Sequence, residues 1–106
     1  MRDYQIYSKI KNIAEVRNKF LKENENSVDR LKFFGIFNYC LNSLKDEYKL
    51  ILLNSYFNIT YQFWWLDYFC KSSYYRKRFV AVNSFVSLYE MIYENFNDDS
   101  AFINFA

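Results

Sequence analysis

Histidine and proline are absent from this 106-residue chain, and glycine occurs only once, at Gly35. Turns between β-strands depend heavily on glycine and proline, so a sheet protein of this composition is not expected. A single glycine also excludes the glycine-rich loops that cradle phosphate groups. The missing histidine removes the commonest general base of enzymes, and no other base is evident beside a serine or cysteine. These absences favour an all-α protein that is not an enzyme.

Cysteine is scarce, with Cys40 and Cys70 the only two in the sequence. Both lie among apolar or aromatic neighbours, where a free thiol behaves as a small hydrophobic side chain. A zinc site would need further ligands, and the chain has no histidine to supply them. The adjacent carboxylates of Asp98 and Asp99 also lack further ligands, which favours a solvated tail over a metal pair. We expect no metal site and no cofactor.

Long apolar runs are missing as well, since none approaches the roughly 18 residues that a membrane-spanning helix requires. The N-terminus is charged and alternates with polar residues, unlike a secretory signal peptide. We therefore expect a cytoplasmic protein without a membrane partner. Hydrophobic residues make up 52% of the chain, which is enough to bury one core. The length predicts a single helical domain over residues 1–106.

Apolar residues recur at helical spacing along most of the chain, and this periodicity predicts about five helices. Ser27, Ser43 and Thr60 are placed to cap the second, third and fourth of them. Trp64 and Trp65 fall in the fourth helix, where core packing is favoured over stacking on bases. The predicted helices run from Asp3 to about Glu23, from Ser27 to about Asn42, from Ser43 to the connector at Asn54–Thr60, from Tyr61 to about Phe69, and from Ser73 to about Asn95.

Basic residues are concentrated at the start of the last predicted helix, although the net charge is only +2. A tight turn at Cys70–Ser72 is predicted to precede this helix. On a helical wheel, Tyr75, Phe79 and Val82 point inward. The residues predicted to point outward, or to flank that surface, are Lys71, Ser73, Arg76, Lys77, Arg78, Val80 and Ser84. A short helix, a turn and a second helix with a basic N-terminal face have the layout of a helix-turn-helix, here over about residues 61–95.

A family resemblance covers roughly Leu41–Ile92. This region resembles the C-terminal helix-turn-helix region of bacterial RNA polymerase sigma factors, and more closely the small phage-type transcription regulators and their mycoplasma relatives. The matching positions are Leu41, Leu44, Glu47, Lys71, Ser72, Ser73, Tyr74, Tyr75, Arg76 and Lys77. Cys70 replaces the serine that often caps the recognition helix, and Tyr68 lies near the position of the usual turn glycine. The promoter-melting regions of a sigma factor are missing.

The resemblance implies that Ser73, Arg76 and Lys77 face DNA. Arginine and lysine suit the acceptors that guanine presents in the major groove, and phosphates attract further basic groups. The candidate DNA-binding residues are Lys71, Ser72, Ser73, Tyr74, Arg76, Lys77 and Arg78. The predicted function is that of a small transcription regulator that binds double-stranded DNA, with RNA polymerase as a further partner.

Two alternatives stay open at this point. The basic run is often only a solvated helix face, with no partner at all. In the second alternative, the protein is a protein-interaction module that does not read DNA and instead binds RNA polymerase or a second copy of itself. In a homodimer, the contact would be made by the apolar stripe Ile6, Ile10, Ile13 and Phe20. The sequence indicates no ligand pocket.

Overall fold

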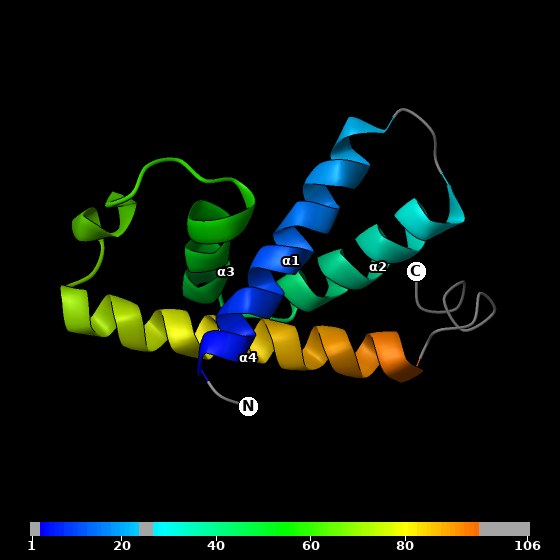
Figure 1. Ribbon diagram of the computed structural model, residues 1–106. Coiled ribbons are helices and arrows are strands. Elements are labelled where there is room, and N and C mark those ends of the chain that lie inside the picture. The colour runs from blue at the N-terminus through cyan, green and yellow to red at the C-terminus, as the bar shows by residue number, and fades with distance from the viewer. Residues whose placement is uncertain (1–2, 24–26, 96–106) are drawn as a thin grey trace.

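The computed structural model describes residues 3–23 and 27–95, and within these ranges the chain is helical without any β-strand (Figure 1). The expected all-α class is therefore confirmed, with four α-helices in the described ranges where about five were predicted. Two shorter segments have other helical geometries. The elements are α1 (Asp3–Lys22), α2 (Val28–Asn42), α3 (Asp46–Leu52), the π-helical segment η1 (Leu53–Phe57), the 3₁₀ turn η2 (Trp64–Asp67) and α4 (Lys71–Asn95).

The longest helix, α4, is the platform of the fold. Its 25 residues correspond to roughly 37 Å at the usual helical rise. Helices α1, α2 and α3 all contact it and lie along one side of it (Figure 1). The side that they cover carries Ala81, Val82, Phe85 and Val86, none of which has any exposed surface. The apolar face of α4 is therefore where the other helices bury theirs.

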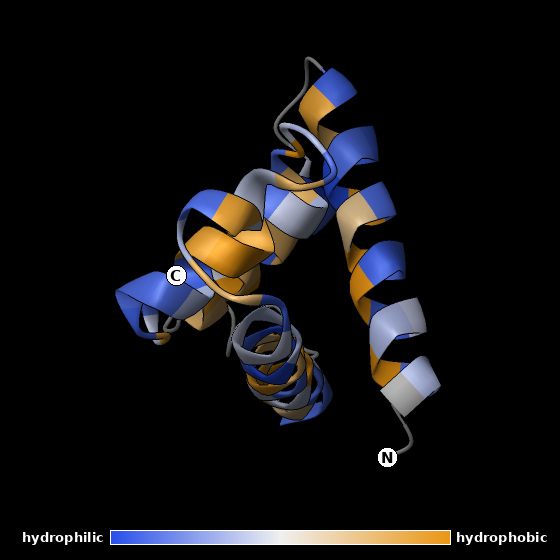
Figure 2. Ribbon diagram, turned by 90° about the vertical axis from the view of Figure 1, so that its left-hand side faces the viewer, coloured by the Kyte–Doolittle hydropathy of each residue, from blue (hydrophilic) through white to orange (hydrophobic). Residues whose placement is uncertain are grey.

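The core combines aliphatic side chains of all four α-helices with aromatic side chains of α2, η1 and α4. Ile6 and Ile10 of α1 are buried, and Figure 2 shows the apolar side of α1 turned toward the rest of the molecule. Phe37 of α2 lies with its ring centroid 4.7 Å from that of Phe57 and 5.6 Å from that of Phe85. These edge-to-face contacts join three elements at one point, which fixes how α2 and η1 cross α4.

Three of the four residues of the α1 stripe that was predicted to join two subunits are buried within a single chain, and the fourth, Phe20, is half-buried. Ile6, Ile10 and Ile13 are 1%, 0% and 7% exposed within a single chain. They pack into the protein's own core, so they are not available to join two subunits. The interface predicted on these isoleucines is therefore wrong.

One of the three predicted helix caps is confirmed. The Ser27 hydroxyl accepts a hydrogen bond from the Arg30 backbone N–H at 3.1 Å, as expected of a cap before α2. Ser43 instead ends α2, where its hydroxyl donates to the Tyr39 carbonyl at 2.8 Å. Helix α3 begins after Lys45, without a side-chain cap. The last carbonyl groups of a helix have no backbone partner within it. A serine directly after the helix can donate its hydroxyl to one of them, and the hydroxyl is then not available to cap the next helix.

The helix predicted over Tyr61–Phe69 is not formed, so the helix-turn-helix predicted over about residues 61–95 lacks its first helix. Thr60 caps nothing, since its hydroxyl lies 3.4 Å from the Asn54 side-chain oxygen, and the region holds only the four-residue turn η2. Trp64 and Trp65 are both buried, so their predicted place in the core is confirmed. A short segment that buries two adjacent indoles takes its shape from those contacts rather than from helix propensity.

Two further expectations concern the C-terminal tail and membrane-spanning helices. Asp98 and Asp99, and with them the solvated tail predicted there, lie outside the described residues. Within the described part, no helix is both long enough and apolar enough to cross a lipid bilayer.

The central aromatic contact supports a stability prediction. Replacing Phe85 by alanine should lower the free energy of unfolding by about 3–5 kcal/mol, because it empties a fully buried site that Phe37 and Phe57 cannot refill. Urea denaturation followed by circular dichroism measures this change. Leu66→Ala, at a residue that is 60% exposed, is the matched control and should shift the value by no more than about 0.5 kcal/mol. Equal losses in the two variants would contradict this description of the core.

Candidate functional site

Cys70 occupies the cap position of α4, which begins at Lys71 and not at the predicted Ser73. The Cys70 carbonyl accepts a hydrogen bond from the Tyr74 N–H at 2.9 Å, so the first turn of the helix closes on this residue. Lys71 and Ser72, expected in a turn, therefore belong to the helix. The backbone N–H of Ser73, the Ser72 hydroxyl and the charge of Arg76 all lower the pKa of the Cys70 thiol. Sulfur here takes the acceptor role that serine usually fills.

Three of the candidate DNA-binding residues form one exposed surface. Lys71, Ser72 and Arg76 are exposed on the first turns of α4, and we call them the α4 basic face. No carboxylate of the described residues lies within ion-pair distance of Lys71 or Arg76. The next candidate along the helix, Ser73, is half-buried. The face therefore presents two unneutralised cations at one end of the molecule.

Tyr74 lies on the opposite side of the helix and is 4% exposed. Its ring stacks on that of Trp65 with the centroids 4.6 Å apart, and its hydroxyl lies 2.8 Å from that of Ser55. The helical wheel had placed Tyr75 inward, yet Tyr75 is 41% exposed. The inward direction is set by Trp65, which covers the side of α4 on which Tyr74 lies.

Lys77 is neutralised by a partner far away in the sequence. Its ammonium donates to both carboxylate oxygens of Glu47 on α3, at 3.0 and 2.9 Å. It also lies 5.7 Å from the centroid of the Phe69 ring. This contact joins α3 to α4 and removes Lys77 from the set of free cations.

Arg78 points away from the α4 basic face and into the interior edge of the protein. Its guanidinium carbon lies 4.7 Å from the centroid of the Tyr7 ring and 4.9 Å from that of Tyr75. Its Nε is buried without a hydrogen-bond partner. No carboxylate of the described residues pairs with this arginine either. This cation is compensated by the faces of aromatic rings and by a side-chain hydrogen bond with Tyr7.

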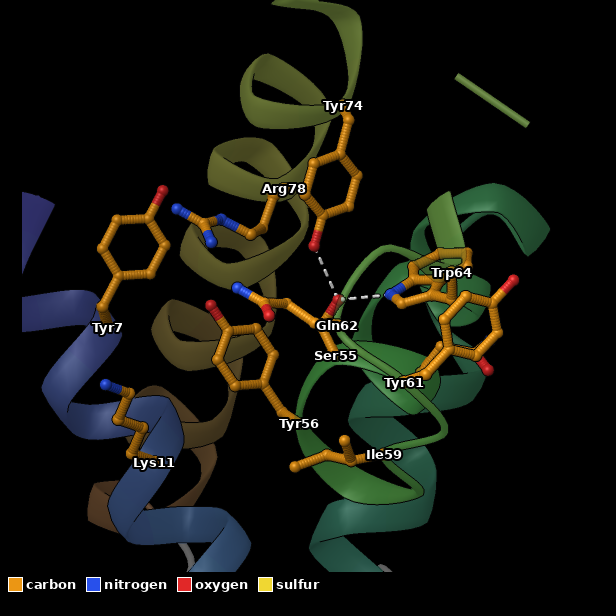
Figure 3. Close-up of a pocket in the computed structure, with 11 residues that line it drawn as sticks. Tyr7, Lys11, Ser55, Tyr56, Ile59, Tyr61, Gln62, Trp64, Tyr74 and Arg78 are labelled. Atoms are coloured by element: carbon orange, nitrogen blue, oxygen red, sulfur yellow. Dashed lines mark hydrogen bonds between the residues drawn. The ribbon is translucent and has the colours of Figure 1, made fainter. Parts of the chain in front are cut away.

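A pocket of about 390 Å³ opens beside Arg78, and we call it the aromatic pocket (Figure 3). Its walls come from α1, η1, the loop after η1, η2 and α4. The Ser55 hydroxyl links two walls, because it accepts from the Trp64 indole N–H at 3.2 Å and lies 2.8 Å from the Tyr74 hydroxyl. The lining includes Tyr7, Lys11, Ser55, Tyr56, Gln62, Trp64, Tyr74 and Arg78.

Sequence reasoning missed this pocket. Its residues come from segments about 70 positions apart, from Tyr7 to Arg78, and share no periodic pattern. The only available signal was the density of tyrosine around the basic run. That signal does not say which tyrosines face one another.

A second exposed feature lies next to η2. Five large apolar side chains are exposed in the segment between η1 and α4, and we call them the apolar patch. They are Ile59, Tyr61, Phe63, Leu66 and Tyr68. Exposed apolar groups gathered in one short segment are typical of an interaction surface. In the described residues, no three or more histidine, cysteine or carboxylate side chains lie close enough to hold a metal ion.

No family model, curated protein or solved structure matches this chain.

The two cysteines should differ sharply in reactivity. Alkylation of Cys70 by iodoacetamide should reach half its maximal rate at a lower pH in the folded protein than in urea, because the helix start lowers the pKa of this thiol. Cys40 is buried, which raises its pKa to about 12, and it should react only on unfolding. Mass spectrometry of the two peptides gives both rates. A Cys70 midpoint at or above its value in urea would contradict the cap geometry, and Ser72→Ala should raise the folded midpoint.

Proposed function

We propose that this protein is a DNA-binding regulator of transcription, without enzymatic activity, that contacts double-stranded DNA through the α4 basic face. The observation that carries the proposal is the pair of exposed cations, Lys71 and Arg76, which lack carboxylate partners among the described residues. Exposed cations at the N-terminal end of a helix are what a recognition helix presents to the major groove.

The placement of α4 supports this proposal. Its N-terminal end extends past α3 toward one end of the molecule, with η2 beside it (Figure 1). An α-helix is about 10–12 Å across with its side chains, and the major groove of B-form DNA is about 12 Å wide. The first backbone N–H groups of a helix also favour a phosphate, and the Ser72 hydroxyl is exposed beside them.

The exposure of each candidate residue guides which of them we propose for DNA contact. Arg76, one turn into the helix, is assigned to base edges, and Lys71 with Ser72 to phosphates. Ser73 is half-buried and adds at most a backbone contact. Lys77 is held by Glu47 and would reach DNA only by leaving that carboxylate. The proposal omits Tyr74 and Arg78, which face the interior. A regulator of this kind would act in the cytoplasm.

The apolar patch favours a second candidate function, a protein-interaction module. Its five exposed side chains lie beside the N-terminal end of α4, where a partner bound at DNA could reach them. If the resemblance of Leu41–Ile92 to sigma factors holds, the corresponding region of those proteins also contacts other transcription proteins. RNA polymerase is therefore the partner to test, either together with DNA or without it.

The DNA proposal is tested by selection from a random duplex pool at two salt concentrations. The wild-type protein should enrich a sequence motif, and its affinity should fall steeply with salt because phosphate contacts release counterions. Lys71→Ala/Arg76→Ala should abolish the enrichment, since a lost arginine–guanine contact costs about 1–3 kcal/mol of discrimination. The slope of log affinity against log salt should fall by about one unit for each phosphate contact removed.

The matched control removes the same charge elsewhere. Lys19→Ala/Lys22→Ala lowers the net charge equally in the last turn of α1, at a distance from the N-terminal end of α4. This variant should still enrich the motif. If both double variants lose binding equally, net charge and not the α4 basic face explains the affinity. If the wild type enriches no motif, DNA reading is refuted, and a pull-down with RNA polymerase then tests the second candidate function.

A further inference from the structure

We infer that the aromatic pocket binds a small aromatic anion, a molecule with a planar ring and a carboxylate or phosphate group. The inference goes beyond the proposed function and does not rest on it, because the pocket and the α4 basic face share no side chain. Its volume of about 390 Å³ lies in the range of small-molecule sites.

The charge of the pocket sets the sign of its ligand. Arg78 and Lys11 both line it, and no acidic side chain of the described residues does. Neither cation has an ion-pair partner within the described part of the chain. An anion entering the pocket would therefore meet two cations and would displace no competing carboxylate.

Arg78 is also short of hydrogen bonds. Its buried Nε has no acceptor, although buried donors in folded proteins are nearly always satisfied. The guanidinium is a planar fork whose parallel N–H groups fit the two oxygens of a carboxylate or phosphate. Tyr7 and Tyr75 lie against this guanidinium at 4.7 and 4.9 Å, which restricts how it can turn. The guanidinium is therefore held in one orientation at the pocket wall, with a side-chain hydrogen bond to Tyr7 and no carboxylate partner among the described residues.

The walls suit an aromatic body. Tyr7, Tyr56, Tyr61, Trp64 and Tyr74 all border the cavity, and their rings surround the central space (Figure 3). The phenols of these tyrosines are uncharged at neutral pH and do not repel an anion. Aromatic side chains give a planar ligand a large apolar contact area.

The backbone at this site is unusual as well. Ser55 and Tyr56 come from η1, a π-helical segment closed by a 2.6 Å hydrogen bond from the Asn58 N–H to the Leu53 carbonyl. Single π-helical turns are rare and frequently occur at functional sites. Here the wider turn presents both residues to the pocket. The Ser55 hydroxyl is fixed by Trp64 and Tyr74, so this wall is held in place before any ligand arrives.

The test uses four defined probes. Adenosine 5′-monophosphate and indole-3-acetate are aromatic anions with a phosphate and a carboxylate, respectively. Adenosine has a ring without the anion, and inorganic phosphate has the anion without a ring. Titration calorimetry gives the affinity, and tryptophan fluorescence reports occupancy because Trp64 lines the pocket. At least one aromatic anion should bind with a stoichiometry of one, about tenfold or more tightly than adenosine and phosphate.

Variants then place the binding in the pocket. Arg78→Gln should weaken binding of the aromatic anion by about 10- to 100-fold, the loss expected for a charge-assisted contact. Arg76→Gln is the matched control: it removes the same charge two positions away on α4, outside the pocket, and should leave the affinity unchanged. If circular dichroism shows that Arg78→Gln does not fold, Lys11→Gln replaces it. Lys11 is exposed, and its loss should weaken binding by about two- to fivefold.

Three results would overturn the inference. The first is that neither aromatic anion binds at millimolar concentration. The second is that adenosine binds as tightly as its monophosphate, which would remove the role of the anion. The third is that Arg76→Gln weakens binding as much as Arg78→Gln, which would place the ligand on the α4 basic face. Loss of DNA binding in the Lys71→Ala/Arg76→Ala variant has no bearing on any of these results.

Discussion

The burial of one face of α4 is the constraint on which the rest of the structure depends. Helices α1, α2 and α3 all contact α4, whereas α1 and α2 contact each other much less. Their apolar surfaces would be exposed to water without it, and apolar burial is the main favourable term in folding. The aromatic rings of Phe37, Phe57 and Phe85 meet where these elements cross. These ring contacts fix how closely α2 and η1 pack against α4.

This constraint divides the basic run into three environments. Successive residues on a helix are about 100° apart, so Arg76, Lys77 and Arg78 point in three directions. Arg76 faces solvent and Lys77 forms an ion pair with Glu47 on α3. The guanidinium of Arg78 packs against the Tyr7 ring of α1. A compact cluster in the sequence is therefore an exposed cation, a neutralised ion pair and a pocket cation. Each supports a different role, and only the first contributes to the proposed DNA contact.

The aromatic pocket arises where the chain leaves regular α-helical geometry. Helix α3 passes directly into the π-helical segment η1, and the loop after it returns to α4 through η2. Trp64 and Trp65 anchor that return by packing on Tyr74, with centroid distances of 5.9 and 4.6 Å. The same segment also carries the apolar patch, two members of which, Ile59 and Tyr61, border the pocket as well. Burial of the two indoles thus positions both the pocket wall and the patch.

The sequence by itself determined the features that depend on local patterns. Without proline and with one glycine, the all-α class could be predicted, and so could the extents of α1 and α2 and the Ser27 cap. Tertiary contacts decided the rest. Packing of Trp65 made Tyr74 the inward residue in place of Tyr75, and Glu47 took Lys77 from 30 positions away. Periodicity shows which residues prefer burial, but the partner of a side chain depends on which segments meet in space.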